Sequence, residues 1–206
     1  MIVPPPARTV LLGPPYRLFS SNVPLSEESP ERRARAGPFG MDIRNVLYSG
    51  FHERTVIAAV VTTFAILPTE SAIRVTVTCP VQGYLGFIAF GFASVACRFH
   101  SALHDPIPAP SGTSTFERRG GGSAHGGLNP FPLPVGGPFW QGPLVPTTFT
   151  YTLNVTSLPQ SAPAREAVLS CAMEGWIQVG GFAHAFLAAS VSPTFFIELW
   201  RGFNFS

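Results

Sequence analysis

Apolar and polar residues alternate along three stretches of the chain. The stretches are Ala72 to Thr78, Phe149 to Val155 and Leu169 to Val179. In the first, Ile73, Val75 and Val77 take one parity and Arg74, Thr76 and Thr78 take the other. Because successive side chains of a strand point to opposite faces, this period of two predicts three strands, each with one buried and one polar face.

Four further apolar stretches predict additional strands. Residues 43–48 and 55–67 are rich in β-branched residues, which favour a strand even though length alone leaves a helix open for the second. Residues 87–95 follow a turn at 82–84 and are apolar on both sides, as in a sandwich interior or a subunit contact. Residues 195–200 predict a further β segment on the surface.

The composition supports an all-β fold in one domain. The 206 residues include 22 Pro and 20 Gly but are 46% hydrophobic, so the chain can bury a core while being broken into short elements. Residues 1–37 have no sustained apolar period and are expected to form a flexible, extended N-terminal arm. Residues 38–206 are expected to form the folded domain, with most of residues 104–147 in loops.

The basic residues are all arginine, and their number exceeds that of the acids only slightly. The formal net charge of +2 is too small for the whole domain to bind a polyanion, so any contact with nucleic acid must be local. Arg32, Arg33 and Arg35 are the candidates, since guanidinium groups suit phosphate oxygens. Acidic residues directly upstream leave the alternative of a solvated tail open.

The catalytic and metal-binding patterns fail on inspection. Ser123 lacks the Gly-x-Ser-x-Gly elbow, and Gly120 to Gly122 lack the Lys of a phosphate loop. His100 and His104 have helical metal-site spacing, but no third ligand is indicated. Three Cys without CxxC spacing indicate neither zinc nor a disulfide framework. We expect a non-enzyme with no catalytic residue, metal or cofactor, and a start without a secretory signal.

Two segments resemble the coat proteins of the tymovirus family, including its marafivirus-like and maculavirus-like members. Val61-Thr62-Thr63-Phe64 followed by Ile73 to Val77 is similar to that family's Thr-Thr-Phe and Val-Thr strand pair. Residues 37–50 are similar to the entry segment and first strand of that family, with Gly40 in place of the usual Gln. Residues 147–179 are similar to the closing strands of that family. Residues 118–142 do not match, and residues 181–206 extend beyond the usual ending.

The resemblance implies an eight-stranded antiparallel jelly-roll sandwich that assembles with copies of itself into an icosahedral shell around positive-sense RNA. It implies a virion protein that is present in the host cytoplasm during assembly. The expected subunit contacts are five apolar residues beyond what one thin sandwich needs: Phe87, Phe90, Phe92, Phe195 and Trp200. RNA is expected to bind weakly, because residues 1–50 have a balance of only +2.

A small integral membrane protein is the alternative function. Residues 75–97 contain no charged residue and have the length of a spanning helix. Pro80, Gln82 and the alternation at the start of this stretch favour strands and no stable membrane association.

Overall fold

The computed structural model describes residues 3–89, 92–109, 112–128, 139–155, 158 and 160–206, with the backbone alone for residues 105–128 and 139–141. Nearly all of its regular structure is β-strand, with one short 3-10 helix at Leu25–Glu27. The strands are β1 (Arg8–Leu12), β2 (Leu18–Ser21), β3 (Arg32–Gly37), β4 (Gly40–Leu47), β5 (Gly50–Ile66), β6 (Glu70–Cys79), β7 (Gln82–Ala89), β8 (Phe92–Ala109), β9 (Gly112–Leu128), β10 (Phe139–Pro143), β11 (Thr147–Asn154), β12 (Arg165–Gly181), β13 (Ala183–Val191) and β14 (Thr194–Arg201).

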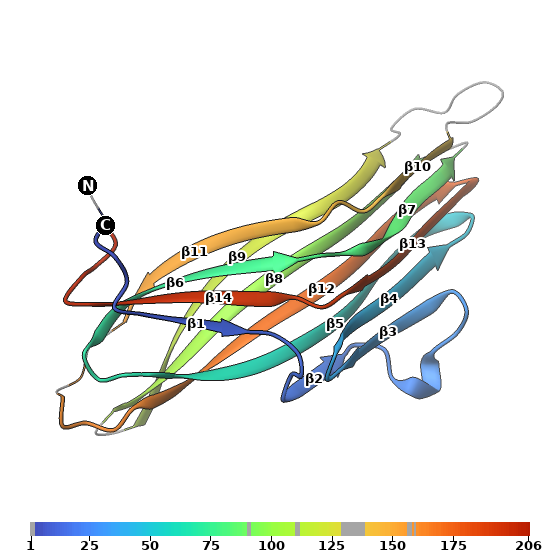
Figure 1. Cartoon of the computed structure of the whole chain (residues 1–206). Coiled ribbons are helices and arrows are strands. Elements are labelled where there is room, and N and C mark those ends of the chain that lie inside the picture. The colour runs from blue at the N-terminus through green and yellow to red at the C-terminus, as the bar shows by residue number, and fades with distance from the viewer. Residues whose placement is uncertain (1–2, 90–91, 110–111, 129–138, 156–157, 159) are drawn as a thin grey trace.

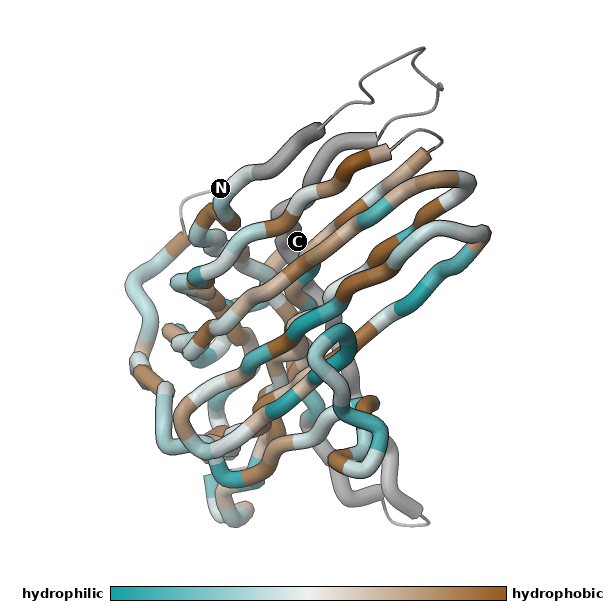
Figure 2. Tube along the Cα trace, turned by 90° about the vertical axis from the view of Figure 1, so that its right-hand side faces the viewer, coloured by the Kyte–Doolittle hydropathy of each residue, from teal (hydrophilic) through white to brown (hydrophobic). Residues whose placement is uncertain are grey.

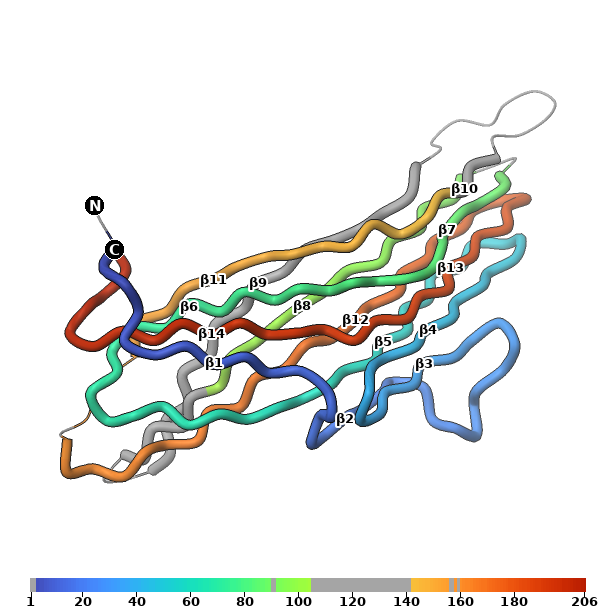
Figure 3. Tube along the Cα trace, viewed as in Figure 1, coloured from blue at the N-terminus to red at the C-terminus, as the bar shows by residue number. Residues whose placement is uncertain are grey.

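The strands form three antiparallel sheets. Sheet A has the order β1-β14-β6-β11, sheet B the order β2-β5-β12-β8-β9, and sheet C the order β10-β7-β13-β4-β3. Sheets A and C lie end to end, because β6 continues into β7 and β13 continues into β14 (Figures 1 and 3). Together they form one layer, and sheet B forms the other, so the chain is an antiparallel β-sandwich.

The core lies between the two layers. Ile73, Val75 and Val77 of β6 are fully buried, as are Leu169 and Met173 of β12 in the facing layer. Figure 2 shows hydrophobic and hydrophilic positions alternating along the strands. The three alternating stretches are therefore confirmed as strands with the predicted buried parity, and the all-β sandwich is confirmed with them.

Three predictions for other stretches are wrong. Residues 87–95 are not one strand, because β7 belongs to sheet C and β8 to sheet B. Residues 82–84 do not reverse the chain, because β6 and β7 run on in one direction past Pro80 (Figure 3). Residues 104–147 are not mostly loop, because β8 reaches Ala109 and β9 follows it. β9 pairs with β8 along a long ladder of backbone hydrogen bonds, which does not require apolar side chains.

The segment 195–200 is also placed differently from the prediction. It forms β14, which is hydrogen-bonded to β1 on one side and β6 on the other. Phe195, Leu199 and Trp200 are buried. The segment is a strand, as predicted, but it lies in the middle of sheet A with partners from distant parts of the chain on both edges, while Phe196 on its outer side is exposed.

The first 37 residues are largely paired with the sandwich. β1 pairs with β14, β2 with β5 and β3 with β4. Tyr16 and Val23 are buried in the core, and the Tyr16 hydroxyl donates a hydrogen bond to the carbonyl oxygen of Pro193. The expected boundary at residue 37 therefore lies inside the β3–β4 hairpin.

The stretch 75–97 bears on the membrane alternative. Its described residues lie in β6, β7, β8 and the short connection between β6 and β7. Within the described part of the chain, no helix has the length and apolar character that crossing a membrane requires.

Candidate functional site: the outer face of sheet C

The outer face of sheet C is the side turned away from sheet B. On β13, Ala185, Leu187 and Ala189 are buried against the core, so the residues between them point outward. The strand register then places outward residues of β3, β4, β13 and β7 in rows across the sheet. These rows change from polar near sheet A to aromatic near the opposite end.

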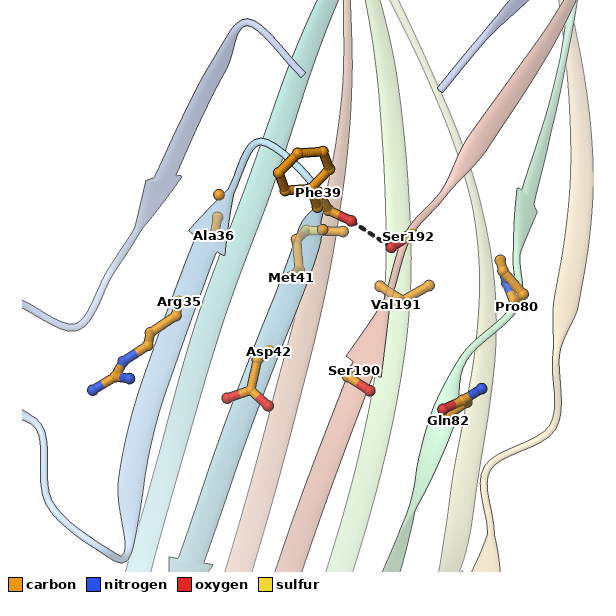
Figure 4. Close-up of a pocket in the computed structure, with 12 residues that line it drawn as sticks. Arg35, Ala36, Phe39, Met41, Asp42, Pro80, Gln82, Ser190, Val191 and Ser192 are labelled. Atoms are coloured by element: carbon orange, nitrogen blue, oxygen red, sulfur yellow. Dashed lines mark hydrogen bonds between the residues drawn. The ribbon is translucent and has the colours of Figure 1, made fainter. Parts of the chain in front are cut away.

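A polar row lies closest to sheet A. Arg35, Asp42, Ser190 and Gln82 are direct partners on four adjacent strands. Figure 4 shows their side chains side by side, below the hydrogen bond that the Ser192 hydroxyl donates to the carbonyl oxygen of Phe39. They help to line a depression of about 580 Å³ at the bend between sheets C and A.

The three arginines predicted to contact RNA all carry carboxylate partners. Arg32 contacts Glu27 at 3.0 Å, Arg33 contacts Asp42 at 2.6 Å, and Arg35 contacts Glu28 at 2.5 Å. The Arg35 guanidinium lowers the pKa of the Glu28 carboxyl by hydrogen bonding to it. Arg33 and Arg35 lie on the outer face of sheet C, because they pair with Arg44 and Asp42 of β4. Arg32 has the opposite parity on β3, shared with buried Ala34.

Arg44 is a member of this site that the sequence analysis did not select. It is exposed on β4, directly opposite Arg33 on one side and Ala188 on the other. Among the described residues, it has no ion-pair or hydrogen-bond partner for its guanidinium. Its parity within β4, shared with Asp42, was the available signal, but Arg44 lies outside the arginine cluster of residues 32–35.

An aromatic row follows Arg44 across three strands, and we call it the aromatic strip: Tyr48, Tyr84, His184 and Phe186. The ring centroids of Tyr84 and Phe186 are 5.7 Å apart, those of Phe186 and His184 5.9 Å, and those of His184 and Tyr48 4.7 Å. With Arg44 and Glu31, these rings line a depression of about 390 Å³. Tyr48 and Tyr84 are exposed, and His184 and Phe186 are half-buried. Aromatic rings at a surface stack on planar or apolar ligand groups, and a guanidinium without an acidic partner binds anions.

The subunit-contact candidates are not on this surface. Phe87, Phe195 and Trp200 are buried within the chain, which contradicts their assignment as contacts, because their side chains fill the space between or beside the sheets. Phe92 is half-buried and packs against Gly180, where an added Cβ would lie 2.0 Å from its ring. Phe90 lies outside the described residues.

Other large apolar residues are exposed instead. Phe51 is 83% exposed and Phe182 is 76% exposed. Both stand where strands of the two layers connect. We call these two residues, together with Ile88, which lines a depression with Phe182, the apolar tip. A depression of about 600 Å³ lies between the tip residues Ile88 and Phe182 and the strip residues Tyr48 and His184. A second exposed group is near the N-terminus: Leu11, Leu18, Phe19, Leu25 and Phe39.

The three thiols serve as core side chains. Cys79, Cys97 and Cys171 are free and buried. Burial raises the pKa of Cys97 to about 12, so the thiolate that nucleophilic chemistry or metal binding needs is disfavoured there. In the described part of the chain, no three His, Cys, Asp or Glu residues are placed to hold a metal ion.

Comparison with known proteins gives no relative from which to transfer a function. No family model matches the chain, and no curated protein matches it.

Proposed function

We propose that the chain is the coat protein of a small icosahedral, positive-sense RNA virus of the tymovirus type, with a jelly-roll fold. The observation that carries this proposal is the order in which the chain visits the two layers. It is supported by the pattern of exposed apolar side chains.

The strand order supports a jelly roll once the bent strands are taken as single units. β6 with β7, β10 with β11, and β13 with β14 each run through both sheet C and sheet A. With each bent strand counted once, the strands from β4 to β14 form eight units, numbered in chain order. The layer made of sheets A and C then has the order first-eighth-third-sixth, and sheet B has the order second-seventh-fourth-fifth. This order supports the double Greek key of an eight-stranded jelly roll, with β1, β2 and β3 added at the edges.

The exposed side chains favour a shell protein among the jelly rolls, which also serve as lectins and cupins. An isolated domain gains nothing from large exposed phenylalanines at its connections, whereas a subunit buries them against its neighbours. The apolar tip and the exposed N-terminal group therefore replace Phe87, Phe195 and Trp200 as the proposed contacts. Closed symmetry requires such patches on each copy.

The proposed shell is held together mainly by protein contacts. Arg32, Arg33 and Arg35 already have carboxylate partners, so this cluster adds little net charge to neutralise phosphates. A shell that depends on its genome would need many such contacts per subunit and would fall apart as salt competes for them.

The test is the mass of the purified protein by light scattering, compared between the wild type and a variant with Phe51→Ser and Phe182→Ser. We expect the wild type to form large closed particles and the variant to remain a folded, small species. A matched control, Trp176→Ser on the outer face of sheet B, should still assemble. A wild type that is monomeric in all conditions contradicts the proposal, and a monomer that binds oligosaccharides would indicate a lectin instead.

A further inference from the structure

We propose that the aromatic strip together with Arg44 is a binding site for single-stranded RNA, in which bases stack on the rings and a phosphate contacts Arg44. This inference rests on the proposed function, in which the chain encloses RNA, and it states where and by what chemistry the RNA binds.

The geometry of the strip suits successive bases. Tyr84 comes from β7, Phe186 and His184 come from β13, and Tyr48 follows β4, so the rings cross three adjacent strands. Each ring lies within 6 Å of the next, at centroid distances of 5.7, 5.9 and 4.7 Å. Opposite Phe186 on β7 is Gly86, so no side chain projects there. A sheet surface with exposed aromatic rings is a common stacking platform for single-stranded nucleic acid, because every base has a π-face.

The charge next to the strip suits a phosphate. The Arg44 guanidinium has no acidic partner among the described residues, and it shares the depression with Tyr84 and Phe186. Its cross-strand neighbour Arg33 is held by Asp42 at 2.6 Å, so Arg33 adds little attraction. Glu31 also lines the depression, and its carboxylate accepts a hydrogen bond from Ser29 at 3.2 Å.

This distribution of charge predicts that stacking dominates and that salt matters little. The Arg44 guanidinium in this depression neutralises about one phosphate per subunit. For single strands, the logarithm of the binding constant then falls with the logarithm of salt concentration with a slope of about −0.7 per phosphate contact. An arginine-rich arm would give a slope several times steeper.

The outer face of sheet B provides the matched control. It also has an aromatic residue and an arginine, Trp176 and Arg98, but they are occupied by each other and by acids. Arg98 lies 5.4 Å from the Trp176 ring centroid, and the indole Nε1 donates a hydrogen bond to Glu53 at 2.8 Å. A base that approached this face would have to displace those contacts.

The experiment measures the anisotropy of a short fluorescent single-stranded RNA titrated with the full-length protein. Replacing Tyr84 and Phe186 by Ser should weaken binding by about tenfold or more, since each base–aromatic contact is lost. Arg44→Gln should flatten the salt slope towards zero, and Arg44→Lys should restore it. Trp176→Ser and Arg98→Gln should leave binding unchanged. Circular dichroism and thermal unfolding establish that each variant is folded.

Two results overturn the inference: unchanged RNA affinity in the folded Tyr84 and Phe186 variant, or an equal loss in the Trp176 control. If the Tyr84 and Phe186 variant cannot be obtained in folded form, ultraviolet crosslinking of the wild-type protein to RNA tests the inference instead. The inference requires crosslinked peptides from β7 and β13, and crosslinks elsewhere overturn it. Failure here is separable from failure of the proposed function. Particles whose RNA crosslinks elsewhere refute the strip alone, whereas a monomer that binds RNA through the strip refutes the shell alone.

Discussion

The outer faces of the two layers are built by the same strand alternation but end in opposite states. On sheet B, Glu174 contacts both Arg98, at 3.2 Å, and His100, at 3.3 Å, while Trp176 is held by Glu53. On sheet C, Arg44 has no such partner among the described residues, and the aromatic strip lies open beside it. Both faces contain arginine and aromatic residues, so composition does not separate them. The difference is that sheet B pairs its arginine with both an acid and an aromatic ring, whereas sheet C leaves Arg44 without such a partner beside rings that contact one another.

The largest effect is expected for a change that reaches the core under sheet A. Val75→Asp places an unpaired carboxylate at a fully buried position, which should cost about 3–5 kcal/mol and abolish soluble protein. Thr76→Asp, one residue along on the outer side, should remain soluble, with unfolding measured by circular dichroism. Wild-type solubility of the Val75 variant would show that the facing of β6 is wrong.

Removing one carboxylate from each outer face tests the comparison directly. Glu174→Ala leaves Arg98 and His100 without their shared acid and should lower the free energy of unfolding by about 1 kcal/mol. Asp42→Ala on sheet C should cost less, about 0.5 kcal/mol, because the Asp42 side chain is 40% exposed.

The two variants should rank in the opposite order in their effect on RNA affinity, with the larger change for Asp42→Ala. Asp42→Ala frees Arg33 beside Arg44 and should strengthen RNA binding, whereas Glu174→Ala should not. Denaturant unfolding and RNA titration of the same two preparations give both readings. A larger gain in RNA affinity for Glu174→Ala would assign the nucleic-acid surface to sheet B.

The smallest effect on stability is expected for Arg44→Ala. The side chain is exposed and has no ion-pair or hydrogen-bond partner among the described residues, so the free energy of unfolding should change by less than about 0.5 kcal/mol. Arg98→Ala should cost more, because it loses both Glu174 and the Trp176 ring. Equal unfolding midpoints for the two variants would remove the distinction between an occupied and an open face.

Local patterns predicted the elements whose two faces differ in polarity. The strands around Val75, Leu153 and Met173 have one polar face and one buried face. Their period of two is visible in the sequence without knowledge of the neighbouring strands. The stretch 195–200 lacks that information, because its position in the middle of sheet A depends on pairing with β1 and β6. The Gly-rich strand β9 shows no side-chain period and is recognised only by its ladder with β8.

The site was predictable only in part for a similar reason. Arg33 and Arg35 were found as a cluster, but their neutralisation by Asp42 and Glu28 depends on how the β3–β4 hairpin folds. Arg44 stands alone in the sequence and was missed. The aromatic strip joins β7 and β13, which are about a hundred residues apart, and register across strands cannot be seen in one segment.

The most direct test of the central claim is electron microscopy of the purified protein, with and without RNA, at physiological salt and in about 1 M salt. At the higher concentration the Debye length is only about 3 Å, so exposed ion pairs are screened while apolar contacts persist. We predict closed, roughly spherical particles in all four conditions, including hollow shells without RNA. Dissociation to subunits in about 1 M salt would contradict a shell held by protein contacts, and monomers in every condition would contradict the coat-protein proposal itself.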